Sequence, residues 1–206
     1  MHVELYDSEE QQVEAIKDWW KENGKAVIVG TVVGIGGLLG WRFYQDSVLE
    51  AQEAASDAYM TAMTQLTDQG AQAQDQVEAF ISTNSDSEYA VLAALQLAKA
   101  QVEAGELDGA LEQLNWAQAN TGDNALKAVT TYRVARLQAE LGNDSDALAS
   151  LDSLTHQDWA GRVAELRGDI LLRSGDEDAA YQAYSEAQQS ADNSPGLQMK
   201  LDDLAK

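Results

Sequence analysis

The sequence predicts an all-α protein in which a single N-terminal transmembrane helix is followed by a solenoid of helical hairpins. An uncharged stretch, residues 26–41, interrupts a chain whose formal net charge is −22. Residues that favour helices (Ala, Leu, Gln and Glu) are abundant, whereas the 206 residues include one proline, the strongest helix breaker. The C-terminal half also repeats one spacing of small residues and glycines, which is typical of stacked helix pairs.

The transmembrane helix is predicted over residues 25–44, because aromatic residues extend the uncharged stretch to the roughly 20 helical residues that cross a bilayer core. Eight strongly apolar residues must offset five glycines there, so insertion is predicted to have little margin. A buried soluble helix and a cleaved signal peptide are the competing interpretations. They are weaker, since the bulky run Trp41-Arg42-Phe43-Tyr44 follows the stretch where cleavage needs small residues.

Basic and aromatic residues flank this span and predict its orientation. The topology and interface anchors are Lys17, Lys21, Lys25, Trp19, Trp20, Trp41, Arg42 and Tyr44. Basic residues are retained on the cytoplasmic side, and after Arg42 none follows until Lys99. We therefore predict a cytoplasmic N-terminus and a C-terminal domain outside the cytoplasm, in the periplasm of a Gram-negative bacterium.

Glycines inside the span form two pairs, Gly30 with Gly34 and Gly36 with Gly40. This spacing allows a second helix to approach closely in a membrane. The four glycines are therefore predicted to form a helix-packing surface. The alternative is that glycine is simply frequent in membrane helices.

Residues 1–24 are predicted to be a cytoplasmic segment with an amphipathic helix along the membrane surface, because Val13, Ile16 and Trp20 recur on one face. Asn23-Gly24 is expected to end this helix, and a solvated tail is the alternative. Residues 45–206 are expected to form the external domain, beginning with a helix pair over 46–82.

Three later segments share one pattern of small residues, glycines and large residues. They read Ala98-x6-Gly105-x4-Ala110-x3-Leu114, Ala135-x6-Gly142-x4-Ala147-x3-Leu151 and Gly168-x6-Gly175-x4-Ala180-x3-Tyr184. The small residues allow two helices to pack closely, and the glycine makes the turn between them. These positions resemble the tetratricopeptide repeat. The units are predicted at about 89–122, 126–158 and 160–192, with a terminal helix at 196–206.

Composition excludes several classes of function. Residues 46–206 contain 28 acidic and 9 basic residues, a net charge of −19, which disfavours binding to nucleic acid or anionic lipid. The chain has no cysteine, and its two histidines, His2 and His156, are far apart in sequence. We therefore predict no catalytic, cofactor or metal site, no small-molecule substrate, and no enzymatic activity.

Stacked helix pairs present their first helices as a concave surface for peptides or proteins. By repeat position, the candidate groove residues are Leu92, Leu95, Lys99, Val102, Val129, Tyr132, Arg136, Arg162, Asp169 and Arg173. Four of these ten are basic, in a domain with nine basic residues, so the groove would suit unfolded segments or an acidic partner. The alternative is that several belong to the core between repeats or to ordinary surface.

Longer stretches resemble a known family, the YfgM family of ancillary SecYEG translocon subunits. The stretches that carry this resemblance are residues 12–25, 40–44, 126–129, 133–136, 159–160, 166–168 and 197–201. The resemblance implies a single-pass protein of the bacterial inner membrane with a periplasmic tetratricopeptide-like domain. It also implies association with SecYEG and the chaperone PpiD, and assistance to newly exported, unfolded proteins. A scaffold for another envelope assembly, in outer-membrane biogenesis, division or stress signalling, is the alternative function.

Overall fold

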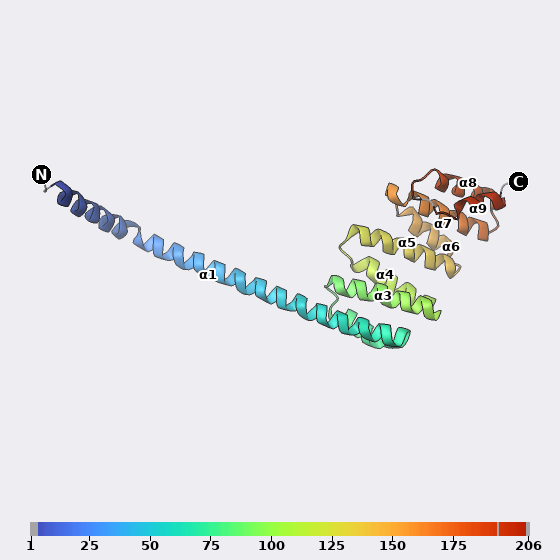
Figure 1. The fold of residues 1–206 in the computed structure, drawn as a ribbon, viewed down its shortest axis with the longest axis horizontal. Helices are drawn as coiled ribbons and strands as arrows, with labels where there is room; N and C mark the ends of the chain where they lie inside the picture. The colour runs from blue at the N-terminus through green and yellow to red at the C-terminus, as the bar shows by residue number, and fades with distance from the viewer. Residues whose placement is uncertain (1–3, 193, 205–206) are drawn as a thin grey trace. The chain divides into compact units, whose positions relative to one another are not determined.

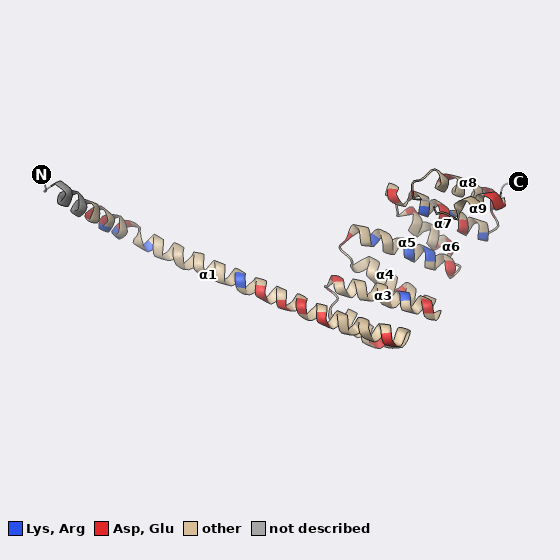
Figure 2. Cartoon of the chain, in the orientation of Figure 1, with Lys and Arg blue, Asp and Glu red and all other residues tan. Residues whose placement is uncertain are grey.

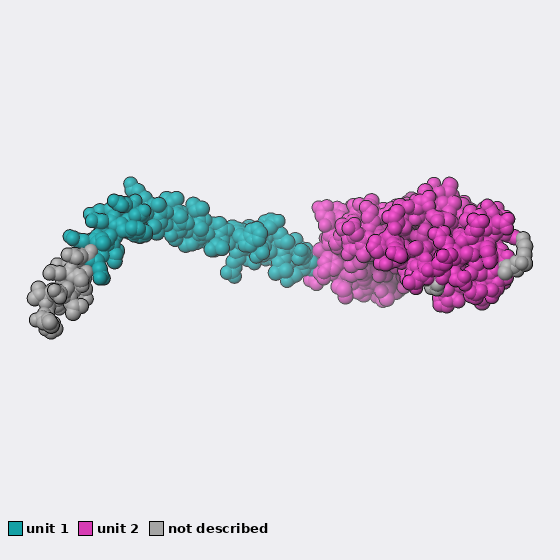
Figure 3. Space-filling view, turned by 90° about the horizontal axis from the view of Figure 1, so that it is seen from above, with its two compact units in different colours: residues 1–53 teal, residues 54–206 magenta. Residues whose placement is uncertain are grey.

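The computed structural model describes residues 4–192 and 194–204, with side chains from residue 12 onward (Figure 1). It contains two compact units, residues 1–53 and residues 54–206 (Figure 3). Every element within the described ranges is a helix. The predicted all-α class is therefore confirmed.

The first element, α1 (Glu4–Gln69), is one continuous helix. The predicted helix end at Asn23-Gly24 is therefore wrong. The Asn23 side chain donates a hydrogen bond to the Trp19 carbonyl oxygen at 3.0 Å, within the helix, and the Trp20 ring covers Gly24. One glycine costs a helix about 1 kcal/mol, whereas an interruption would require a second nucleation, so the helical residues on both sides prevail.

Within the first unit, α1 carries the apolar stretch that the sequence indicated. Among the described residues, the structure has one helix that is long and apolar enough to cross a membrane, and its apolar window is entirely exposed. Figure 2 shows this part of α1 without red or blue residues, between charged segments. The predicted N-terminal span thus lies in an apolar part of α1 that no other described residue buries.

The second unit stacks helical hairpins (Figure 1). After α1, the 3-10 helix η1 (Gly70–Ala73) leads into α2 (Gln74–Thr83). Three hairpins follow: α3 (Glu88–Ala104) with α4 (Leu107–Asn120), α5 (Asn124–Glu140) with α6 (Asp144–Asp152), and α7 (Ala160–Arg173) with α8 (Glu177–Gln188). A second 3-10 helix, η2 (Gln157–Trp159), precedes α7, and α9 (Leu197–Leu204) ends the described chain.

Each hairpin turns at a glycine of the repeated pattern. Gly105, Gly142 and Gly175 have φ angles of 81°, 80° and 88°. This left-handed region strains residues that carry a Cβ, so glycine is favoured there. The glycine spacing in the sequence therefore marks three real turns.

The core of the second unit consists of three hydrophobic clusters along the stack. The first joins the end of α1 to α2, α3, α4 and α5, and includes Ala62, Phe80 and Leu97. The second joins α5, α6 and α7 around Leu151, and the third joins α7, α8 and α9 around Tyr184. Because α5 and α7 each contribute to two clusters, they hold neighbouring hairpins together.

Candidate functional site

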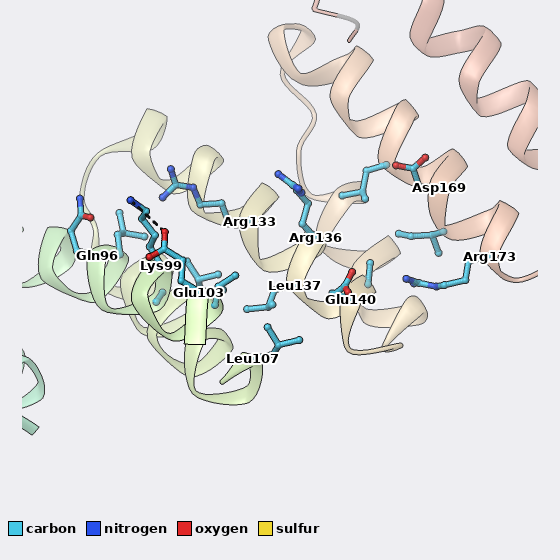
Figure 4. A pocket seen from close by; sticks show the side chains of 17 residues that line it. Gln96, Lys99, Glu103, Leu107, Arg133, Arg136, Leu137, Glu140, Asp169 and Arg173 are labelled. Atoms are coloured by element: carbon cyan, nitrogen blue, oxygen red, sulfur yellow. Dashed lines mark ion pairs between the residues drawn. The ribbon is translucent and has the colours of Figure 1, made fainter. Parts of the chain in front are cut away.

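A groove of about 840 Å³ crosses the first helices of the three hairpins (Figure 4). Residues of α3, α4, α5 and α7 line it: Leu95, Gln96, Ala98, Lys99, Val102, Glu103, Leu107, Leu114, Arg133, Arg136, Leu137, Ala139, Glu140, Leu166, Asp169, Ile170 and Arg173. On α3, α5 and α7, these residues extend from the middle of each helix to its C-terminal end. A single ligand in the groove could therefore contact three consecutive repeats.

The floor of the groove is apolar because the inner faces of the first helices also form the core. Leu95, Leu137 and Ile170 line it and are buried, whereas Val102, also in the groove, is 45% exposed. An exposed apolar side chain beside a buried apolar floor offers area that a bound segment can cover.

Charged side chains surround this floor, and most have partners. Lys99 pairs with Glu103 of the same helix at 3.7 Å, and Arg173 pairs with Asp144 of α6. Asp169 accepts hydrogen bonds from Lys200 at 2.6 Å and from the Tyr184 hydroxyl at 2.7 Å. Neither Arg133 nor Arg136 has a side-chain hydrogen bond or ion pair with any residue that the structure describes.

Six of the ten residues predicted for the groove line it, namely Leu95, Lys99, Val102, Arg136, Asp169 and Arg173. The other four, Leu92, Val129, Tyr132 and Arg162, do not line it. They precede the groove-lining residues of α3, α5 and α7. Repeat position therefore identifies residues on the side of the first helices that faces the groove, but the groove occupies only part of that side.

Two of those four residues form a separate cluster with Trp159. The Tyr132 and Trp159 rings are 5.5 Å apart, and the Arg162 guanidinium lies 5.3 Å from the centre of the Trp159 ring. Burial raises the pKa of Tyr132, an effect that the nearby positive charge of Arg136 opposes. Arg162 is therefore a cation-π partner of Trp159.

Sequence reasoning missed several groove residues, of which Arg133 matters most. Arg133 precedes Arg136 by three positions, and residues three apart share a helix face, so this spacing was the available signal. Leu137, Leu166 and Ile170 gave no such signal, because apolar residues of a first helix are equally expected in the core.

A polar network joins α9 to α7 at one end of the groove. The Lys200 ammonium lies 2.9 Å from Glu165 Oε1 and 2.6 Å from Asp169 Oδ1, and Ser194 Oγ donates to Glu165 at 2.8 Å. Burial alone would raise the pKa of Glu165, but the hydrogen bonds from Lys200 and Ser194 outweigh it and lower that pKa. Burial would likewise lower the pKa of Lys200, and the bonds to Asp169 and Glu165 raise it instead.

The residues predicted at the membrane span lie on α1. A Cβ added at Gly30, Gly34, Gly36 or Gly40 would meet no described atom within 4 Å, so this surface is open. The anchor side chains Lys17, Trp19, Trp20, Lys21, Lys25, Trp41, Arg42 and Tyr44 are exposed. Among the residues that the structure describes, no group of three His, Asp or Glu side chains is arranged to hold a metal ion.

Comparisons with known proteins agree with this architecture. A family model described as a tetratricopeptide repeat-like domain matches residues 17–206. The "Ancillary SecYEG translocon subunit" of Escherichia coli (strain K12) is 39% identical over 207 residues, which cover 98% of this chain and 100% of that protein. A protein of Haemophilus influenzae (strain ATCC 51907 / DSM 11121 / KW20 / Rd) with the same name is 35% identical, over 95% of this chain and 97% of its own length.

Among solved structures, the crystal structure of MamA matches with a TM-score of 0.53 and 18% identity, and covers 70% of this chain and 82% of that chain. At this identity the match concerns the fold alone, and it confirms the predicted tetratricopeptide-like solenoid. The chain therefore belongs to the tetratricopeptide repeat-like family whose members include the ancillary SecYEG translocon subunits.

Proposed function

We propose that this chain is a membrane-anchored accessory subunit of the SecYEG translocon that binds segments of newly exported proteins in the groove across α3, α5 and α7. The observation that carries the proposal is the groove itself, an apolar floor with charged sides contributed by three consecutive repeats. The names of full-length relatives support the translocon as its location. Its role is to bind, as is usual for stacked helix pairs, and not to catalyse.

The proposed topology has one membrane span over residues 25–44, in the bacterial inner membrane. Residues 1–24 lie in the cytoplasm and residues 45–206 in the periplasm. The exposed apolar window of α1 and the basic residues that precede it support this arrangement. Gly30, Gly34, Gly36 and Gly40, which have no neighbour among the described residues, are the proposed contact surface for a translocon helix.

In the proposed mechanism, the membrane anchor keeps the groove close to the exit of the channel. A groove held at the exit of the channel meets segments before they fold, and it covers their apolar side chains until they pass on. The resemblance to the YfgM family adds the chaperone PpiD as a proposed partner, which would receive such segments.

Site-specific photocrosslinking in cells tests the proposal. Probes at Val102, which is exposed in the groove, and at Gly36, on the open surface of α1, are compared with a probe at Tyr181 of α8. Tyr181 is 43% exposed and does not line the groove, so it is a matched control. We expect Val102 to crosslink to chains in transit and Gly36 to a SecYEG subunit, whereas Tyr181 crosslinks to neither.

Two outcomes would contradict the proposal. One is equal crosslinking of exported chains from Val102 and Tyr181, because the groove would then have no special role. The other is the absence of translocon contacts from Gly36 together with contacts to outer-membrane assembly or division proteins, which would indicate a scaffold elsewhere in the envelope.

A further inference from the structure

The groove contains two arginines that the fold itself does not use. Arg133 and Arg136 both belong to α5, the middle of the three first helices, and line the groove. Figure 4 shows both side chains extending into the space between α3 and α7, with Arg136 directed away from Glu140 of the same helix. Their guanidinium groups have no hydrogen bond or ion pair within the described part of the chain.

Most other charged side chains on the groove have partners. Glu140 is the exception, since its side chain has no hydrogen bond or ion pair within the described part of the chain. Lys99 and Arg173 are paired with carboxylates, and Asp169 is held by Lys200. The lining contains four of the nine basic residues that follow residue 46, in a part of the chain whose net charge is −19. The two unpaired arginines outnumber the one unpaired carboxylate, Glu140, and Arg136 points away from it (Figure 4). They therefore form a local positive site in a strongly acidic domain, which is the condition for selecting a negative ligand.

Their spacing limits the ligand further. Residues three apart on a helix lie on one face, with Cβ atoms about 5–6 Å apart. Two carboxylates at a similar distance, one helical turn or two extended residues apart, could each accept paired hydrogen bonds from one guanidinium. In the same groove, Leu137 and Ile170 are buried and Val102 is exposed, which suits apolar side chains of the same ligand.

We infer that the groove binds peptide segments that combine apolar side chains with two closely spaced carboxylates, and that Arg133 and Arg136 select them. This inference rests on the proposed function and specifies which segments of exported proteins the groove takes. A volume of about 840 Å³ is in the range of sites that enclose a short segment and is too small for a folded domain. Segments in which lysines replace the two carboxylates are rejected, because they would place ammonium groups against unpaired guanidiniums.

The test measures binding of short fluorescent peptides to the full chain in lipid nanodiscs. One peptide contains four leucines and two glutamates placed three positions apart, and its matched partner contains glutamines in place of the glutamates. We expect the acidic peptide to bind the wild-type chain more tightly than the amide peptide. The double variant Arg133→Gln/Arg136→Gln should weaken the acidic peptide about tenfold or more and leave the amide peptide unchanged.

The control is Lys127→Gln/Arg167→Gln, which also removes two positive charges, one from α5 and one from α7, at positions that do not line the groove. Arg167 pairs with Asp152, so this variant also shows the effect of losing an ion pair outside the groove. This control separates the local arginine site from a general effect of net charge, and thermal unfolding of each variant verifies its fold. Equal binding of the two peptides to the wild-type chain would overturn the inference. An equal loss of acidic-peptide binding in both double variants would overturn it too.

The outcome for this inference is distinguishable from that for the proposed function. If Val102 crosslinks to chains in transit but the groove does not prefer the acidic peptide, carboxylate selection is wrong and the translocon function stands. If the groove prefers the acidic peptide but Val102 never contacts an exported chain, the groove selects carboxylates for a different partner and the proposed function is wrong.

Discussion

Gly168 and Tyr184 are where the third hairpin differs most from the other two. In the repeated pattern, the first hairpin has Ala98 in its first helix and Leu114 in its second. The second hairpin has Ala135 and Leu151 at the same two positions. In the third, glycine replaces the alanine and tyrosine replaces the leucine. A Cβ added at Gly168 would overlap the Tyr184 ring, which is 1% exposed. The larger residue on one helix therefore requires the smaller one on the other.

We predict that Gly168→Ala destabilises the chain despite improving helix propensity. Overpacking a core costs about 1–3 kcal/mol, which exceeds the roughly 0.8–1.0 kcal/mol gained by replacing a helical glycine. Tyr184→Leu alone should also destabilise, because it leaves a cavity and removes the hydrogen bond to Asp169. The double variant restores the pair found in the other hairpins and should lose less than the sum of the single losses. Denaturant unfolding of the four chains measures this coupling, and simple additivity would contradict it.

Lys200 makes the attachment of α9 depend on pH. The pKa of Glu165 is lowered from its usual 4.5, so its contribution to stability is present above that pH and is lost as the pH falls through the folded value. The pKa of Lys200 is raised from its usual 10.5, so its contribution is present below that pH and is lost as the pH rises through the folded value. At neutral pH both contributions are present.

We therefore predict that Lys200→Met lowers the melting temperature at neutral pH. Its effect should become smaller as the pH falls below 4.5 and through the lowered pKa of folded Glu165. The methionine retains an apolar chain beside the Tyr184 ring, over which the Lys200 ammonium lies at 5.5 Å. Melting curves between about pH 3 and pH 7 measure the difference from the wild type. Lys127→Met is the control, since Lys127 is exposed on α5 and makes no ion pair with the described residues. A loss from Lys200→Met that is independent of pH would contradict the prediction.

Aspartate side chains cap the N-termini of α5 and α7 in two different ways. Asp123 caps α5 locally, and its Oδ1 accepts from the backbone N–H groups of Ala125 at 2.7 Å and Leu126 at 3.0 Å. Helix α7 has no local side-chain cap. Instead Asp192, from the loop after α8, accepts from the N–H groups of Gly161 at 2.8 Å and Arg162 at 3.3 Å. The start of α7 is thus satisfied from 31 residues away in sequence.

We predict that Asp192→Ala destabilises the third hairpin by about 1 kcal/mol, the usual loss for a helix cap. Because the cap comes from the loop, the variant should increase amide exchange both at the start of α7 and around residues 190–196. Asp123→Ala is the comparison, and it should increase exchange at the start of α5 alone. If Asp192→Ala increased amide exchange only near residue 192 and left the start of α7 unchanged, the long-range cap would have no energetic role.

How far the sequence predicts these elements depends on the range of the interaction involved. The glycine turns and hairpins were predictable, because the φ angles of Gly105, Gly142 and Gly175 are local requirements. The expected end at Asn23-Gly24 was wrong, since long helical flanks override a local preference. Arg162 was expected in the groove but lies over Trp159. The groove uses only the middle and C-terminal end of each first helix, and this extent depends on side chains from several repeats, which one repeat's spacing does not specify.

The stability of the second unit as a whole depends on contacts between neighbouring hairpins. No described residue belongs to both the first hydrophobic cluster and the third. The middle cluster links them through α5 and α7, and the segment between α6 and α7, residues 153–159, is mostly exposed. In stacked repeats each unit contacts its neighbours alone, so local destabilisation remains near its origin.

We therefore predict that the second unit opens in parts. Gly168→Ala should increase amide exchange strongly in α7, α8 and α9, less in α5 and α6, and little in α2, α3 and α4, because its cluster lies at the C-terminal end. Hydrogen exchange measured by mass spectrometry under native conditions resolves these segments. The groove is lined by α3, α5 and α7, whose amide exchange is expected to differ in this variant. An acidic peptide that contacts all three helices should therefore reduce the exchange of α7. If Gly168→Ala instead increased exchange equally in all helices, the second unit would unfold as one cooperative unit. A ligand in the groove would then protect all helices equally and not α7 in particular.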